Sequence, residues 1–116
     1  MESWATISVK FPVSDQSKWD ALVVGLSRNE HGACFEEYAE VFGTKAEEYA
    51  GYVLDEWEVE RDNIDTRSSE VAKGKAVIRI SGYEAVAASV QPMVNFLKVC
   101  GATRVAVNKE YDSNGS

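Results

Sequence analysis

Four stretches of the chain alternate between apolar and polar residues, which is the pattern of a strand with one buried face. They cover residues 5–13, 52–61, 75–81 and 103–111. In the first stretch Ile7 and Val9 fall on one face, whereas Ser8 and Lys10 fall on the other. In the second stretch Asp55 interrupts the apolar face. The pattern predicts four half-buried strands.

Two longer stretches carry apolar residues three and four positions apart, which predicts amphipathic helices over 15–27 and 83–100. Ser14 is the expected N-cap of the first helix. A capping box that begins at Ser81 is expected to start the second. Pro92 has no N–H for the helical hydrogen bond, so it predicts either a kink or a fresh helix start.

Residues 34–50 predict a helical insertion between the first helix and the second strand. A helical run ends there at Gly43, and a capping box that begins at Thr44 predicts a short helix that Gly51 ends. Residues 62–74 are polar and have no period, which predicts a long, mobile hairpin loop.

The element order is therefore β-α-(αα)-β-β-α-β, which matches the ferredoxin-like βαββαβ plan. We expect a single α+β domain over residues 1–116, with a four-stranded antiparallel sheet in spatial order 4-1-3-2. Two main helices cover one face, a short helical insertion follows the first helix, and the second strand is an edge. The expected core combines apolar residues of both helices and three strands: Trp19, Leu22, Val90, Leu97, Ile7, Val9, Ile78 and Val105.

The negative charge of the chain is concentrated in residues 35–65. This stretch holds eleven carboxylates and two cations, so its net charge is 2 − 11 = −9, whereas the whole chain carries −7 and the remainder sums to +2. A concentrated acidic field attracts and orients a basic partner. The residues predicted to bind such a partner are Glu36, Glu37, Glu40, Glu47, Glu48, Tyr38, Asp55, Glu56, Glu58 and Glu60.

Ordinary surface roles compete with partner binding for these residues. On the predicted second strand, a ladder of Glu56, Glu58 and Glu60 shares the open sheet face with Lys75 and Arg79. Cross-strand ion pairs there are worth about a few tenths of a kcal/mol each. The glutamates of the insertion have only one cation nearby in the sequence, so a solvated helix face and a partner surface are both open for them.

Composition and motifs argue against several other kinds of site. The pI of about 4.7 argues against sequence-independent nucleic-acid binding and against attachment to an anionic membrane surface. We expect no cofactor and no metal, because residues 62–65 lack the EF-hand pattern and Cys34 and Cys100 lack zinc spacing. His31 is the only histidine, and the sequence pairs it with no nucleophile.

The expected location is the cytoplasm. The N-terminus lacks the pattern of a signal peptide, and no apolar run approaches the roughly 20 residues of a membrane span. Reduced thiols are therefore expected, although a disulfide between the two cysteines remains an alternative.

RNA binding by ferredoxin-like domains uses aromatic residues on the open sheet. The predicted central strands instead offer Thr6, Ser8, Lys10, Val77 and Arg79.

We therefore expect a small acidic, non-enzymatic protein-binding module that presents residues 35–65 to a basic protein surface, one built for nucleic acid. In size, local acidity and lack of catalytic residues, the chain resembles phage-encoded inhibitors such as anti-CRISPR proteins, or the immunity proteins that plug nuclease toxins. The rival is a small cofactorless ferredoxin-like enzyme or ligand-binding protein, often a homodimer, with a cavity between sheet and helices. A filled core would favour the binding module.

Overall fold

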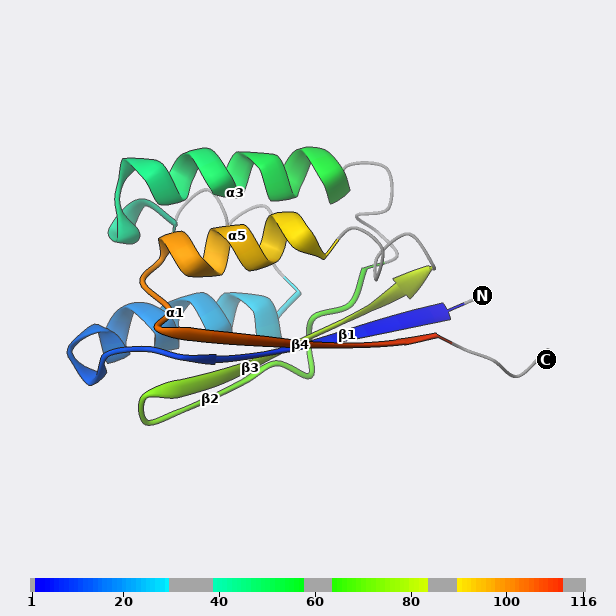
Figure 1. Ribbon diagram of the computed structural model, residues 1–116, viewed down its shortest axis with the longest axis horizontal. Helices are drawn as coiled ribbons and strands as arrows, with labels where there is room; N and C mark the ends of the chain where they lie inside the picture. Colours follow the sequence, from blue (N-terminus) through cyan, green and yellow to red (C-terminus); the bar gives the residue numbers. More distant parts are fainter. Residues whose placement is uncertain (1, 30–38, 58–63, 84–89, 112–116) are drawn as a thin grey trace.

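The computed structural model describes residues 2–29, 39–57, 64–83 and 90–111. Its elements are β1 (Glu2–Lys10), the 3-10 turn η1 (Val13–Asp15), α1 (Gln16–Ser27), the 3-10 turn η3 (Ala39–Phe42), α3 (Thr44–Trp57), β2 (Glu70–Ala72), β3 (Lys75–Tyr83), α5 (Gln91–Val99) and β4 (Arg104–Tyr111). The protein is thus α+β, as expected. The sheet forms one layer, and the helices lie together on one of its faces (Figure 1).

The sheet has four strands in the order β2-β3-β1-β4, so β3 and β1 are central and β2 and β4 are edges. Each neighbouring pair is antiparallel, with Ile7 opposite Ile78 on one side and opposite Val107 on the other. The alternation within β1 is confirmed, because Ile7 and Val9 are buried whereas Ser8 is exposed. β1 begins earlier than predicted and ends before Pro12.

The core lies between the sheet and the helices. All the predicted core residues are buried except Val105, which is half-buried on the edge strand β4. Trp19 of α1 stacks on Phe11 with ring centroids 4.8 Å apart, and it meets Phe42 of η3 edge-on at 5.5 Å. Its Nε1 is buried without a hydrogen-bond partner among the described residues, which costs about 1–3 kcal/mol. This aromatic trio ties η3 to the core.

The predicted second strand over 52–61 is wrong, because residues 44–57 form the single helix α3. Ala46, Ala50 and Val53 are buried at helical spacing, whereas Asp55, which interrupts the apolar face of a strand, is exposed on the helix. Gly51 lies inside α3 and does not end it. Burial of one helix side against the core outweighs the short alternating pattern.

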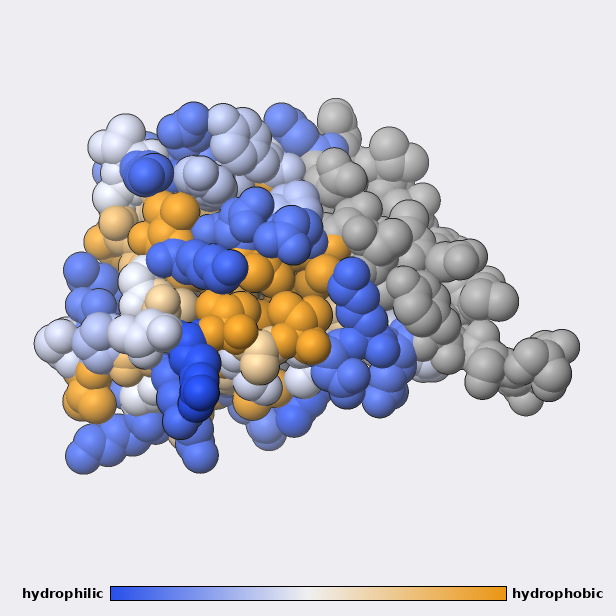
Figure 2. Space-filling view, viewed as in Figure 1, coloured by the Kyte–Doolittle hydropathy of each residue, from blue (hydrophilic) through white to orange (hydrophobic). Residues whose placement is uncertain are grey.

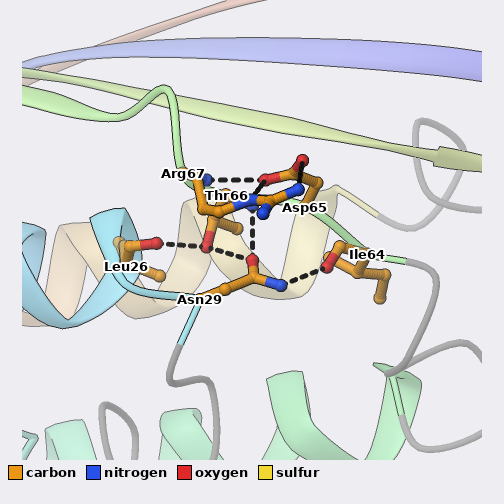
Figure 3. A network of polar contacts seen from close by, with 6 residues as sticks. All are labelled: Leu26, Asn29, Ile64, Asp65, Thr66 and Arg67. Atoms are coloured by element: carbon orange, nitrogen blue, oxygen red, sulfur yellow. Dashed lines mark hydrogen bonds and ion pairs between the residues drawn. The ribbon is translucent and has the colours of Figure 1, made fainter.

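The second strand is instead β2, which lies inside the region predicted as a long hairpin loop over 62–74. β2 and β3 are joined by a turn of two residues, Lys73 and Gly74, since Ala72 pairs with Lys75. Gly74 has a φ of 72°, the left-handed conformation that a tight hairpin requires. Upstream, residues 64–66 are tied to the end of α1 by side-chain hydrogen bonds (Figure 3).

The predicted insertion over 34–50 is part of the folded core in the portion that the structure describes. α3 packs on α5, on the side of α5 that faces away from the sheet (Figure 1). Ala39 of η3 and three residues of α3 belong to the same buried cluster as the sheet. The helical layer is therefore two helices deep at this point.

The predicted helix starts need three corrections. Ser14 does not cap α1, because it lies in η1, and Asp15 takes the N-cap position without a side-chain hydrogen bond. Ser81 does not begin a capping box, because β3 continues to Tyr83. The last helix spans 91–99 rather than 83–100, with Pro92 in its first turn, which confirms the fresh start. Residues 84–89 lie outside the described residues. Among those described, no helix has the length and apolar character needed to cross a membrane.

Candidate functional site

The candidate site lies on η3 and α3, which occupy much of the acidic stretch. Gly43 joins the two elements with a φ of 111°, a left-handed conformation that glycine adopts without strain. Its N–H donates to the carbonyl of Glu40 at 3.1 Å, and its own carbonyl accepts from the N–H of Glu47 at 3.2 Å. The chain therefore passes directly from η3 into the first turn of α3.

α3 has an apolar side and an acidic side. Ala46, Ala50 and Val53 are buried in the core. Glu48 and Asp55 are both exposed and are seven residues apart, which is about two helical turns, so they lie along one line on the outer side. Figure 2 shows that the top of the molecule, where α3 lies, is largely hydrophilic.

We call five of the exposed residues on these elements the acidic face: Glu40, Glu47, Glu48, Tyr52 and Asp55. The hydroxyl of Tyr52 donates to Oε1 of Glu48 at 2.8 Å, and the ring of Tyr49 meets that of Tyr52 edge-on at 5.5 Å. The hydrogen bond to Glu48, together with its negative charge, raises the pKa of Tyr52, because both disfavour the phenolate. These contacts hold the Tyr52 ring on the outer side of α3.

The negative charge of the acidic face is not balanced locally. Residues 39–57 contain five carboxylates and one cation, Lys45, so their net charge is 1 − 5 = −4. Among the described residues, ion pairs join Lys18 to Asp15, Arg67 to Asp65, and Arg79 to Glu70. None of these pairs includes a residue of the acidic face. Its carboxylates therefore direct their charge into solvent.

The structure brings together part of the predicted partner-binding set. Four of its ten residues lie on the acidic face: Glu40, Glu47, Glu48 and Asp55. Five lie outside the described residues: Glu36, Glu37, Tyr38, Glu58 and Glu60. Glu56 belongs to the last turn of α3, so its predicted place in a ladder on the open sheet is wrong. The predicted set lacks Tyr52. The sequence pattern assigns this residue to a strand over 52–61, and it assigns Glu47 and Glu48 to a separate helix.

Arg79 on the open sheet face has a different partner from the predicted glutamate ladder. Its guanidinium lies 3.1 Å from Oε2 of Glu70 on β2 and also donates to the carbonyl of Ser68 at 2.7 Å. A cross-strand ion pair therefore exists at this edge of the sheet, but β2 supplies the carboxylate.

A row of cations crosses the open face of the sheet. Lys10 of β1 lies opposite Lys75 of β3 and opposite Arg104 of β4, and all three are exposed. They border a hollow of about 280 Å³ whose lining includes Ser8, Val77 and Ala106. The sequence does not reveal this row, because it depends on the register of three strands far apart in the chain.

The other reactive groups of the described residues are not gathered into a metal site. Within the ranges that the structure covers, no three His, Cys, Asp or Glu residues are grouped as metal ligands. Cys100 is buried at the end of α5. Cys34 and His31 lie outside the described residues.

Comparisons with protein-family models, with curated proteins and with solved structures found no match.

Proposed function

We propose that this protein is a non-enzymatic binding module that presents its acidic face to a basic surface of a partner protein. The observation that carries the proposal is the arrangement of α3. One side is buried in the core, and the other exposes Glu48 and Asp55 in line, with no cation paired to either among the described residues. Such a field raises the association rate of a cationic surface.

The acidic face also offers contact groups other than charge. Tyr52 of this face and Val41 of η3 are each 50% exposed. Tyrosine is enriched among the residues that dominate binding energy at protein interfaces. Because Glu48 and Tyr49 already hold the Tyr52 ring, less side-chain freedom is lost when a partner covers it.

The proposed partner surface is one built for nucleic acid. Lysine and arginine hold phosphates through charge-assisted hydrogen bonds, and carboxylates are acceptors for the same groups. A rigid helix that displays carboxylates would compete with DNA or RNA for those side chains. This is the logic of an inhibitor of the phage-encoded, anti-CRISPR or immunity type.

The rival function, ligand binding, is supported by a hollow on the open face of the sheet and not by the expected cavity between sheet and helices. Large side chains such as Trp19, Phe96 and Leu22 lie between the sheet and the helices, and each is buried completely. The hollow bordered by Lys10, Lys75 and Arg104 lies on the open face instead. It favours a small anion as a second candidate ligand. Titration with pyrophosphate tests this function, because Lys75→Gln should weaken binding severalfold, whereas equal binding by the variant would contradict it.

We propose further that the fold is a variant of the ferredoxin-like plan. Read from the β4 edge, the strand order is 4-1-3-2, with α1 after β1 and α5 between β3 and β4. The variant features are α3, a full-length helix before the second strand, and β2, which has only three residues.

The binding proposal is tested by affinity capture from the native host with three forms of the protein. Glu48→Gln with Asp55→Asn removes two charges from the acidic face. Ser17→Lys with Val24→Lys changes the net charge equally at two exposed positions of α1, also seven residues apart. We expect the wild type and the α1 control to retain the same basic protein, identified by mass spectrometry, and the acidic-face variant to lose it. Equal retention by all three forms would contradict the proposal.

A further inference from the structure

β4 leaves one long edge of the sheet without a neighbour in the described part of the chain. It spans eight residues and pairs only with β1, whereas the opposite edge, β2, has three. An unpaired edge presents a row of backbone N–H and C=O groups that can bind another strand. The β4 edge is therefore the one with room for a further strand.

An apolar strip accompanies this edge on the helical side of the sheet. Val107 lies opposite the buried Ile7, yet it remains 40% exposed. Val105 is only half-buried, as are Val99 and Ala102 at the end of α5. Figure 2, viewed from the side where β4 and α5 lie in front, shows apolar residues gathered between them.

Opposite charges stand at the two ends of β4 on its open face. Arg104 and Glu110 are six residues apart, so both point to the same side of the sheet, and both are exposed. Neither forms an ion pair within the described residues. The cross-strand neighbour of Arg104 is Lys10, another cation, which is an unfavourable pairing.

We propose that two copies of this chain pair through β4, antiparallel and about a two-fold axis at Val107. Val107 then lies opposite its own copy and covers the exposed apolar strip. Arg104 of each copy lies opposite Glu110 of the other, so the dimer contains two symmetry-related Arg104–Glu110 ion pairs. The two four-stranded sheets join into one sheet of 4 + 4 = 8 strands.

The charges select this register over its neighbours. Residues that lie opposite each other must point to the same side of the sheet. The two-fold axis can therefore shift along β4 only from one residue to another. An axis at Ala106 places Arg104 opposite Asn108, and an axis at Asn108 places Glu110 opposite Ala106. Only the axis at Val107 pairs Arg104 with Glu110. The inference does not depend on the proposed function, because α3 lies in the layer farthest from the sheet and its acidic face stays open (Figure 1).

The test is the mass of the full-length protein by sedimentation equilibrium over a wide concentration range. We expect the wild type to approach 2 × 12.8 = 25.6 kDa. Arg104→Glu and Glu110→Arg should each weaken dimerisation at least roughly tenfold, since like charges then face each other twice. The double variant Arg104→Glu/Glu110→Arg restores the pairing and should dimerise again. Circular dichroism confirms that each variant is folded.

A cross-linking measurement tests the register itself. Val107→Cys places a thiol opposite its own copy, at the Cα separation of about 4.5–5.5 Å that a disulfide accepts. Asn108→Cys is the matched control, because its two copies are offset along the strands. Oxidation should cross-link the first variant and not the second. A wild type that stays monomeric at millimolar concentration, a double variant that does not recover, or stronger cross-linking at position 108 would overturn the proposal.

Discussion

The side chain of Asn29 accepts a hydrogen bond from the backbone N–H of Thr66 at 2.9 Å, across 37 residues of sequence. Its Nδ2 donates to the carbonyl of Ile64 at 3.3 Å, while the Thr66 hydroxyl donates to the carbonyl of Leu26 at 2.6 Å (Figure 3). Asn29 follows α1 with a φ of 60°, the left-handed conformation that asparagine tolerates better than most residues. The end of α1 therefore holds the segment that leads into β2.

Replacing Asn29 by glycine separates its backbone role from its side-chain role. Asn29→Gly keeps the left-handed conformation but leaves the Thr66 N–H without this acceptor, so we expect a loss of about 1–3 kcal/mol in the free energy of unfolding. Asn29→Ala should lose about a further 1 kcal/mol, because alanine disfavours a positive φ. Denaturant unfolding measures both, and a glycine variant as stable as the wild type would show that the side-chain bonds contribute nothing.

Thr66→Val tests the other half of this contact. Thr66 is fully buried, and valine has nearly its shape but no hydroxyl, so the Leu26 carbonyl loses a donor in the core. Because this carbonyl still accepts the backbone N–H of Asn29 at 3.0 Å, we expect the cost of one hydrogen bond, about 0.5–1.5 kcal/mol. Ser68→Ala, two residues along at an exposed position, is the control and should stay within about 0.5 kcal/mol of the wild type. Equal melting of the two variants would contradict the account of this segment.

Adjacent positions in α3 should respond in opposite directions to a larger side chain. Ala50 is buried, so Ala50→Leu should overpack the contact and cost about 1–3 kcal/mol. At Gly51 an added Cβ would meet no atom within 4 Å, so Gly51→Ala should stabilise the helix by about 0.5–1 kcal/mol. Thermal unfolding distinguishes these outcomes. If both substitutions left the melting temperature unchanged, the account of α3 as a helix with one side packed into the core would be wrong.

The pKa of Tyr52 reports on the organisation of the acidic face. The adjacent Glu48 carboxylate raises this pKa above the ordinary value of 10.0. Glu48→Gln removes the charge, so the phenol should ionise at lower pH, while Glu47→Gln should have a smaller effect. Ultraviolet titration measures the change, with Tyr52→Phe to identify the signal among the tyrosines. An unchanged titration in Glu48→Gln would mean that the two side chains do not meet in solution.

The sequence predicts the parts of the fold in which burial follows a regular period. β1 and β3 alternate because one face meets the helices, and α1 places Trp19 and Leu22 on one side. The assignment fails at 52–57, where apolar and polar residues of a helix alternate by chance over a few positions. Asp55 is the signal against a strand, because it interrupts the apolar face. β2 could not be found, because three residues that bury no side chain completely leave no pattern.

The candidate site also has parts that a local pattern reveals and parts that depend on contacts between distant residues. A charge count along the chain locates the acidic stretch, since charge needs no knowledge of contacts. The row formed by Lys10, Lys75 and Arg104 depends on strand register, and the Asn29–Thr66 contact depends on tertiary packing. Neither leaves a local signature. Long-range pairing is therefore the information that the sequence pattern lacks.

The most direct test of the proposed function is the association rate with the captured partner at two salt concentrations. Triple reversal of Glu47, Glu48 and Asp55 to lysine should slow association at least roughly tenfold, because these charges steer the encounter. The wild-type rate should fall steeply with added salt, and that of the triple variant should not. The Ser17→Lys/Val24→Lys control changes the net charge by +2, as Glu48→Gln/Asp55→Asn does, so these two variants are compared with each other, and the control should keep nearly the wild-type rate. If the triple variant associated as fast as the wild type, and if salt changed neither rate, the acidic face would be an ordinary solvated surface.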